Sequence, residues 1–284
     1  MTANSPANRQ VIREKTEARL RQIAGGTAGA LGFAALDLQS GERFGQHENL
    51  DFPQASAIKI PVLLEVFQQA QAGELDLGAA CRIEKVHKTD GSGFLKELGN
   101  GTVMMSLRDL CVLMILVSDN TATNLLIDRV GMERVNQTMA GLGLTHTRLR
   151  RRMMDQAAGE RGDENLSTPA EAVRLLELLY RGEFVSREVS RSILEILRLP
   201  KSSAITAGLP PGTPVAGKPG AIGGVNVEWA LVLAPERPYA LAIMENYGSK
   251  GEATEAFREI SRVLYDYFQR VGRATPHGSY STPR

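Results

Sequence analysis

The spacing of hydrophobic residues predicts strands near both ends of the chain and helices in between. Residues 8–23 carry apolar side chains at helical spacing, and the pattern stops at a pair of glycines. Residues 27–46 have the pattern of a strand hairpin with a central turn. Residues 254–270 form a closing amphipathic helical pattern. Short strand patterns precede this last helix, at residues 214–216, 225–233 and 239–244.

The middle of the chain has a helical pattern almost throughout. Between about residue 75 and residue 200, glycine-rich stretches and one charged loop at 147–166 separate the predicted helices. These helices cover residues 106–117, 120–130, 132–140 and 186–199, with one more beginning at Ser167. An earlier helix begins near Ser56. Because proline is comfortable only in the first turn of a helix, Pro61 predicts a distortion there or a start later than Ser56.

Strands at the two ends and helices in the middle predict an α+β fold. The connections between strands are of hairpin length, which favours an antiparallel sheet formed from both chain ends and flanked by helices. We expect residues 1–46 plus 203–271 to form this α/β sheet subdomain, and residues 47–202 to form an inserted all-helical subdomain. Residues 272–284 are polar, with proline and glycine, and are predicted to be a disordered tail.

The composition is that of an ordinary globular protein. The chain has 284 residues, of which 43% are hydrophobic and 23% charged, with a net charge of +1. This balance gives no electrostatic reason to expect nucleic acid or a membrane surface as a partner. No apolar run reaches transmembrane length, and the polar first residues lack a secretory signal. The sequence as written therefore predicts a cytoplasmic protein, or a periplasmic or secreted one if a leader has been removed. The pattern indicates no oligomeric state.

Cysteine and histidine are too few and too scattered for a disulfide framework or a metal centre. Cys81 and Cys111 are the two cysteines, and neither belongs to a Cys-x-x-Cys pair. The four histidines lack metal-ligand spacing. We therefore expect no metal and no cofactor.

Ser56 and Lys59 form a candidate nucleophile and base at the start of the first inner helix. Residues three apart on a helix share a face, so the hydroxyl and the amine can meet. Burial lowers the pKa of an amine, and a neutral lysine can take the proton of a serine. A helix-capping serine followed by a solvated lysine would give the same spacing.

Two further motifs follow in order. Ser118-Asp119-Asn120 lies between two predicted helices, and Lys218-Pro219-Gly220 ends a strand-like stretch. Each alone could be structural, the first as a helix cap and the second as a turn. Together with Ser56-x-x-Lys59, the ordered set resembles the class A β-lactamase and penicillin-recognising serine hydrolase family. The resemblance covers residues 8–271.

The resemblance implies a role for each catalytic position. Ser56 would be acylated, and Lys59 would activate it. Ser118 would pass a proton to the leaving nitrogen with the help of Lys218. The backbone N–H groups of Ser56 and Ala221 would form the oxyanion hole.

Three more residues are implied in substrate binding. Asn120 would bind the side-chain amide of the substrate. Gly220 belongs to the strand beside the substrate, where Lys218 would bind the substrate carboxylate. An aromatic residue near Phe94 lines the cleft in relatives, although a core phenylalanine would fit the sequence equally well.

The chain departs from the family pattern in the charged loop. The family carries there a glutamate that activates the deacylating water, and Met153 occupies that position here. A thioether cannot act as a general base. Asp155 and Glu160 are possible substitutes, although both could simply pair with the neighbouring arginines. A smaller departure is Pro219, which replaces a threonine.

The sequence thus predicts a serine hydrolase that forms an acyl-enzyme on Ser56. The favoured activity is β-lactamase-like hydrolysis of a small-molecule β-lactam amide, with slow deacylation. A carboxylesterase or a D-amino-acid peptidase or penicillin-binding protein of the same fold is the alternative. A non-catalytic binding module is a further alternative, and the retention of Ser56, Lys59, Ser118 and Lys218 argues against it.

Overall fold

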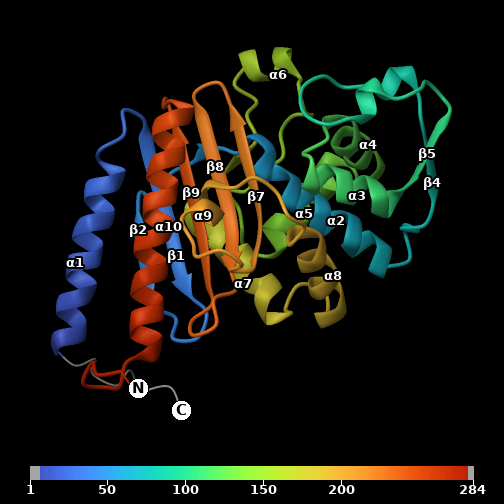
Figure 1. Cartoon of the computed structure of the whole chain (residues 1–284). Helices are drawn as coiled ribbons and strands as arrows, with labels where there is room; N and C mark the ends of the chain where they lie inside the picture. Colours follow the sequence, from blue (N-terminus) through green and yellow to red (C-terminus); the bar gives the residue numbers. More distant parts are fainter. Residues whose placement is uncertain (1–6, 281–284) are drawn as a thin grey trace.

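A five-stranded antiparallel sheet made from both ends of the chain forms the centre of the molecule (Figure 1). The computed structural model describes residues 7–280, and residues 1–6 and 281–284 lie outside the description. The strands run in the order β2-β1-β9-β8-β7. Their bounds are Ala30–Asp37 for β1, Arg43–Gln46 for β2, Val215–Ile222 for β7, Val225–Val232 for β8 and Tyr239–Asn246 for β9. The first strand pairs with the last, from Ala30 opposite Asn246 to Asp37 opposite Tyr239. The predicted α+β fold is confirmed.

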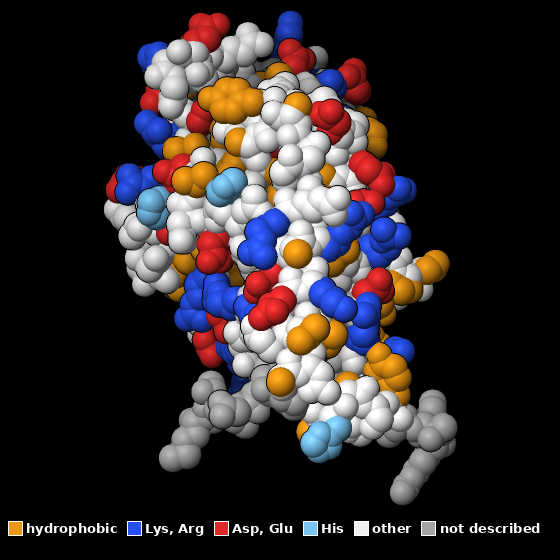
Figure 2. Space-filling model, turned by 90° about the vertical axis from the view of Figure 1, so that its left-hand side faces the viewer, with side chains coloured by type: hydrophobic (Ala, Val, Ile, Leu, Met, Phe, Trp, Pro, Cys, Tyr) orange, Lys and Arg blue, Asp and Glu red, His pale blue; other side chains and the backbone are white. Residues whose placement is uncertain are grey.

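Two long helices cover the outer face of the sheet. α1 (Ala7–Ala24) and α10 (Lys250–Arg273) lie side by side on this face, with the short α9 (Ala204–Ala207) beside α10 (Figure 1). An aromatic cluster closes the space beneath them, where Phe268 contacts Phe44 and Tyr239. The solvent side of this layer, seen in Figure 2, carries interspersed basic and acidic side chains with scattered hydrophobic ones. This face therefore has no patch of a single charge.

A block of helices lies on the other side of the sheet and shares the larger apolar core with it. α7 packs directly on strands β1 and β9, because its apolar stripe faces the sheet. The helical patterns predicted for this region correspond to six helices, which are α2 (Lys59–Gln71), α3 (Leu107–Leu116), α4 (Asn120–Val130), α5 (Met132–Gly141), α7 (Pro169–Arg181) and α8 (Arg187–Leu197). The short α6 (Gln156–Glu160) was not predicted, since it lies within the charged loop. No helix in the part of the chain that the structure describes combines the length and apolarity needed to cross a membrane.

The helical block also contains strands, so its description as all-helical was wrong. β4 (Ala80–Ile83) pairs with β5 (Val103–Ser106), and β3 (Phe52–Pro53) pairs with β6 (Leu166–Ser167). The 3₁₀ turns η2 (Lys85–His87) and η3 (Leu95–Glu97) lie in the segment that connects β4 to β5. Strands of two to four residues are too short for hydrophobic spacing to distinguish them from a helix. The division of the chain into two subdomains stays a prediction.

The tail is more ordered than its composition indicated. α10 continues to Arg273, and Ala274 then forms a β-bridge with Tyr280 around a turn. In that turn the amide of Thr275 donates to the carbonyl oxygen of Ser279 at 2.8 Å. The prediction of disorder was therefore wrong for residues 272–280, because local backbone hydrogen bonds define a turn that hydrophobic spacing does not reveal. Residues 281–284 lie outside the described part.

Gln54 ties the segment before the first inner helix to the sheet. Its side chain is fully buried and accepts a hydrogen bond from Trp229 Nε1 at 2.9 Å. Its side-chain amide nitrogen, Nε2, donates to the carbonyl oxygens of Phe52 and Ser167. A single-turn 3₁₀ helix, η1 (Ala55–Ile58), follows at once, and α2 then begins at Lys59. Pro61 is therefore in the first turn of α2, as the later-start alternative requires.

Replacing Gln54 with alanine leaves the indole N–H of Trp229 buried without an acceptor. We expect Gln54→Ala to lower the free energy of unfolding by about 1–3 kcal/mol, the usual cost of an unsatisfied buried polar group. Urea unfolding measures this, with Gln71→Ala at an exposed helix end as the control, expected within about 0.5 kcal/mol of wild type. Equal effects of the two substitutions would contradict the structural role of Gln54.

Candidate active site

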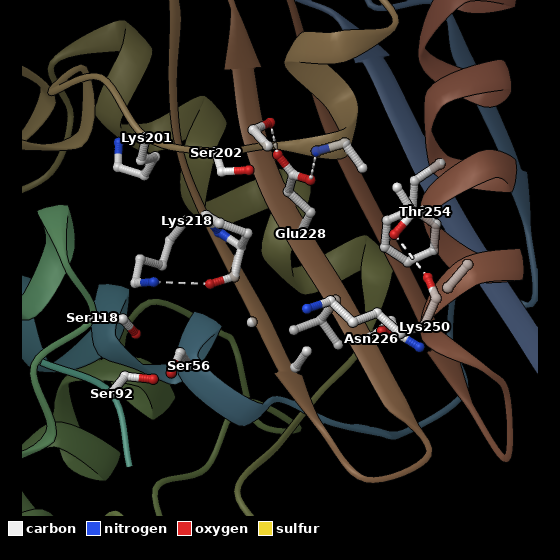
Figure 3. A pocket seen from close by; sticks show the side chains of 18 of the residues that line it. Ser56, Ser92, Ser118, Lys201, Ser202, Lys218, Asn226, Glu228, Lys250 and Thr254 are labelled. Carbon is white, nitrogen blue, oxygen red and sulfur yellow. Dashed lines mark hydrogen bonds between the residues drawn. The ribbon is translucent and has the colours of Figure 1, made fainter.

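A polar cleft of about 470 Å³ lies between the edge strand β7 and the helical block (Figure 3). Ser56 and Ser118 line it from the helical side, and Lys218 lines it from β7. Glu228 on β8 and Lys201 in the segment before α9 complete the charged part of its wall. Three motifs far apart in the sequence thus meet in one cleft.

Lys59 is a lysine with no exposed surface. Its Nζ donates to the carbonyl oxygen of Ser118 at 2.7 Å, to Ser118 Oγ at 3.0 Å and to Asn120 Oδ1 at 2.9 Å. Burial and the nearby charge of Lys218 hold the pKa of Lys59 well below its usual value. The backbone N–H of Lys59 donates to the carbonyl oxygen of Ser56, and among the described residues the two side chains share no hydrogen bond. The structure therefore joins Lys59 to Ser118 and Asn120, with Ser56 one turn away.

The turn between α3 and α4 presents Ser118 to the cleft. Ser118 has a φ of 56°, a left-handed conformation that is uncommon for a residue other than glycine. The next residue, Asp119, caps α4 through the amide of Ala122 and also accepts the amides of Phe94 and Leu95. These bonds hold the turn in place, so Asp119 is a supporting residue and Ser118 a cleft residue.

Lys218-Pro219-Gly220 lies within β7, so its interpretation as a turn was wrong. Pro219 has no N–H, and its carbonyl oxygen accepts a hydrogen bond from Lys218 Nζ at 2.8 Å on the cleft side of the strand. In an antiparallel edge strand every second residue turns its backbone groups the same way. The N–H of Ala221, two residues on, therefore points away from β8 and toward the helical block.

Lys218 is nearly as buried as Lys59, at 2% exposed. Burial, together with the charge of Lys201, lowers the pKa of Lys218 to about 7, and the charge of Glu228 opposes this shift. Two lysines with lowered pKa values thus lie near Ser118, since Lys59 is hydrogen-bonded to it and Lys218 lines the same cleft. A cleft of this kind can both remove a proton from a hydroxyl and attract an anion near neutral pH.

A second hollow of about 350 Å³ opens on the other side of Ser56. Met153 and Asp155 line it together with Asn120. The loop that carries Met153 is fixed by Asn124, which accepts the Met153 amide at 2.8 Å and donates to its carbonyl oxygen at 3.1 Å. These two bonds fix the backbone of Met153, which lines the hollow together with Ser56.

The carboxylates of this loop have other contacts or lie elsewhere. Asp155 caps α6 through the amide of Ala158 and is exposed. Glu164 lines the hollow and accepts two hydrogen bonds from the guanidinium of Arg151. Glu160 is exposed and lines neither the cleft nor the hollow. Of the two substitutes considered from the sequence, the structure brings only Asp155 toward Ser56.

Phe94 is separate from the cleft. Its side chain is 59% exposed, and within the described part of the chain it lines neither hollow beside Ser56. Neither expectation for it, a cleft wall or a core position, describes this residue. Its backbone N–H helps to hold Asp119 instead.

Three residues of this region were not anticipated from the sequence. Glu228 is a buried carboxylate behind Lys218, Lys201 is a partly buried lysine beside it, and Asn124 holds the loop of Met153. Glu228 alone had a visible signal, since it is the single charged residue of strand β8, where every other residue except Asn226 is apolar. Lys201 and Asn124 look like ordinary polar residues in the sequence.

The fold and the cleft together define a penicillin-recognising type of serine hydrolase. A family model described as "Beta-lactamase enzyme family" matches residues 15–268, and the chain belongs to that family. An imipenem-hydrolyzing β-lactamase from Enterobacter cloacae is 29% identical over 84% of each chain.

Solved structures show the same similarity. The structure of PBP-A superimposes with a TM-score of 0.83 at 26% identity, covering 90% of this chain and 96% of that one. A mutant of PBP-A with glutamate in place of a leucine, solved as an acyl-enzyme complex with penicillin-G, has a TM-score of 0.82, again at 26% identity, and covers 90% of this chain and 97% of that one. The protein is a serine β-lactamase-like hydrolase.

Gly220 allows β7 to approach the backbone of η1. A Cβ atom at this position would lie 2.6 Å from the amide nitrogen of Ser56 and 2.9 Å from that of Ala57. We expect Gly220→Ala to push the strand away from Ser56 and to slow acylation of Ser56 by about a hundredfold or more, the usual cost of losing an oxyanion donor. Rates of labelling by a fluorescent penicillin measure this.

Gly223→Ala is the matched control, because a Cβ there has nothing within 4 Å. We expect the control to be labelled at the wild-type rate. Wild-type labelling of Gly220→Ala would contradict the requirement for close approach.

Proposed function

We propose that Ser56 is acylated by β-lactams and that the resulting acyl-enzyme is hydrolysed slowly. The observation that carries this proposal is the buried contact between Lys59 and Ser118 in a cleft that Ser56 and Lys218 also line. The family of the chain supports a β-lactam as the substrate.

Acylation requires a base for the Ser56 hydroxyl. The lowered pKa of Lys59 favours its neutral form, which can take the proton as Ser56 Oγ attacks the β-lactam carbonyl carbon. The active-site contacts of a free enzyme are often looser than those in its substrate complex, so the absence of a hydrogen bond between the Ser56 and Lys59 side chains is compatible with this role.

The remaining groups act on the charge that develops and on the leaving nitrogen. The N–H groups of Ser56 and Ala221 stabilise the oxyanion. Both can reach it because Gly220 has no side chain to push β7 away from the Ser56 amide. Ser118 Oγ, bonded to Lys59, donates its proton to the ring nitrogen as the amide bond breaks, and recovers a proton through Lys59. Protonated Lys218 attracts the carboxylate of the substrate, and Asn120 binds its side-chain amide.

Deacylation lacks an evident base. Met153 lines the hollow from which water would approach the ester, and it cannot accept a proton. Asp155 and Glu164 line the same hollow, but the first caps α6 and the second pairs with Arg151. Slow hydrolysis of the acyl-enzyme follows from this arrangement.

A D-amino-acid peptidase, esterase or penicillin-binding role is the second candidate. A missing deacylation base fits a protein whose natural acyl group differs from that of a β-lactam. The similarity to PBP-A favours this candidate within the same family. In both candidates Ser56 is acylated. They differ in which acyl group is then hydrolysed quickly from Ser56.

Intact-protein mass spectrometry after mixing with penicillin G, sampled from seconds to hours, tests the proposal. We expect an increase equal to the mass of penicillin G that persists and that Ser56→Ala abolishes. Lys59→Met separates an enzyme from a binding module, because it should slow adduct formation at least a hundredfold through loss of the base. An adduct that clears rapidly would contradict slow deacylation, and Asp155→Asn would then test Asp155 as the base. The absence of any adduct would contradict β-lactam acylation.

Installing a carboxylate at position 153 should restore a base. We expect Met153→Glu to speed loss of the penicillin adduct by roughly a hundredfold, the lower range for general-base catalysis, while acylation changes little. Met153→Gln is the matched control, since it has the same length and no group that accepts a proton, and it should stay slow. Equal adduct lifetimes in the two variants would show that position 153 does not face the deacylating water.

A further inference from the structure

We propose that Glu228 and Lys201, which carry opposite charges, together determine whether Lys218 holds a proton and hence the pH range in which Ser56 is acylated. This inference rests on the proposed function and concerns the regulation of the same site. Glu228 and Lys201 are positioning residues in it, acting through Lys218.

Glu228 is a fixed carboxylate behind Lys218. It is directly opposite Pro219 in the β7–β8 pairing, one residue from Lys218, and is 3% exposed. Its carboxyl oxygens accept hydrogen bonds from the hydroxyl of Ser203 and from the amides of Ala204 and Ile205, the latter two at 3.0 and 3.2 Å (Figure 3). A group that accepts three bonds from fixed donors fits the ionised form, which only accepts. Burial raises the pKa of Glu228, whereas these three hydrogen bonds and the charge of Lys218 oppose the rise and favour a buried negative charge at this position.

Lys201 is fixed in the segment between α8 and α9. Its Nζ donates to the carbonyl oxygens of Leu197 and Leu199 at the C-terminal end of α8, at 2.7 and 2.6 Å. Glu228 accepts hydrogen bonds from the hydroxyl of Ser203 and the amide of Ala204. These bonds fix the same short segment at its other end. Lys201 and Glu228 thus line the cleft together at fixed positions.

The two charges act on Lys218 in opposite directions. Lys218 has a single protein hydrogen bond among the described residues, to the carbonyl of Pro219, so no carboxylate pairs with it directly. Burial and the charge of Lys201 lower its pKa, the charge of Glu228 raises it, and the net result is a pKa of about 7. Charges are poorly screened in a buried site, so each of these effects persists at physiological salt. Near neutral pH a change in either neighbour should therefore change the charge of Lys218.

Other charged groups also face Lys218. Lys59 on α2 is buried and its own pKa is lowered in part by Lys218, while Asp119 in the α3–α4 turn is occupied by three amides. Lys250 on α10 lines the outer part of the cleft and is exposed. Glu228, which is buried, and Lys201, which is partly buried, remain the two fixed charges that line the cleft with Lys218.

The consequence concerns the anionic substrate. Protonated Lys218 attracts a carboxylate, and neutral Lys218 does not, so acylation should decline as the pH rises through its pKa. Glu228 favours the protonated form of Lys218 at neutral pH, and Lys201 opposes this effect. The balance between these two charges therefore sets the pH at which acylation declines on the basic side of its pH profile.

Titration of Lys218 by NMR tests the proposal without any substrate. Protein labelled with ¹³C at lysine Cε is titrated, and the Lys218 signal is identified by its loss in Lys218→Met. We expect Glu228→Gln, which keeps the size of the side chain, to lower the apparent pKa of Lys218 by about one unit, and Lys201→Met to raise it by about one unit.

The pH profile of acylation by penicillin G should follow the titration. We expect the basic limb to move to lower pH in Glu228→Gln and to higher pH in Lys201→Met. Lys250→Met removes an exposed lysine of the same cleft and should leave the position of the limb unchanged, because solvent screens that charge.

Shifts in the same direction for the two variants, or an unchanged Lys218 titration in both, would overturn the proposal. If Glu228→Gln fails to fold, Lys201→Met alone decides by the direction of its shift. Opposite shifts in the NMR titration without any penicillin adduct would support the charge balance and contradict β-lactam acylation, so the two failures are distinguishable.

Discussion

The burial of the Lys59 amine is the constraint on which the site depends. An amine without exposed surface must find hydrogen-bond partners inside the protein, because an unsatisfied buried polar group is costly. Ser118 and Asn120 provide them, and to do so the α3–α4 turn adopts a left-handed backbone at Ser118. The carboxylate of Asp119 holds this turn in place by accepting hydrogen bonds from three backbone amides. A single lysine thus fixes the relative positions of α2, α3 and α4.

Much of the architecture could be predicted from hydrophobic spacing. The long helices and the strands at both chain ends have clear periodicity, and their arrangement in an antiparallel sheet follows from hairpin-length connections. The pairs β4–β5 and β3–β6 were missed because two to four residues carry no usable period. The motif Lys218-Pro219-Gly220 was placed at a strand end, whereas it lies inside β7, where an edge position tolerates the proline.

The site shows the difference between motif order and three-dimensional surroundings. Ser56, Ser118 and Lys218 could be assembled from the order of three motifs, and the structure brings them into one cleft. The neighbours that adjust their chemistry could not be found this way, because Lys201 and Glu228 are 27 residues apart and meet only through folding. Phe94 shows the converse limit, since proximity to a motif in the sequence did not bring its side chain into the cleft.

The sheet that carries Lys218 is completed by the pairing of β1 with β9, two strands from opposite ends of the chain. Contacts this distant in sequence form late and depend on the whole chain, since the entropy of closing so long a loop must be overcome first. The cleft is therefore complete only in molecules that have folded from end to end. Under the proposed acylation of Ser56, covalent labelling of this serine would count only the molecules that have folded completely.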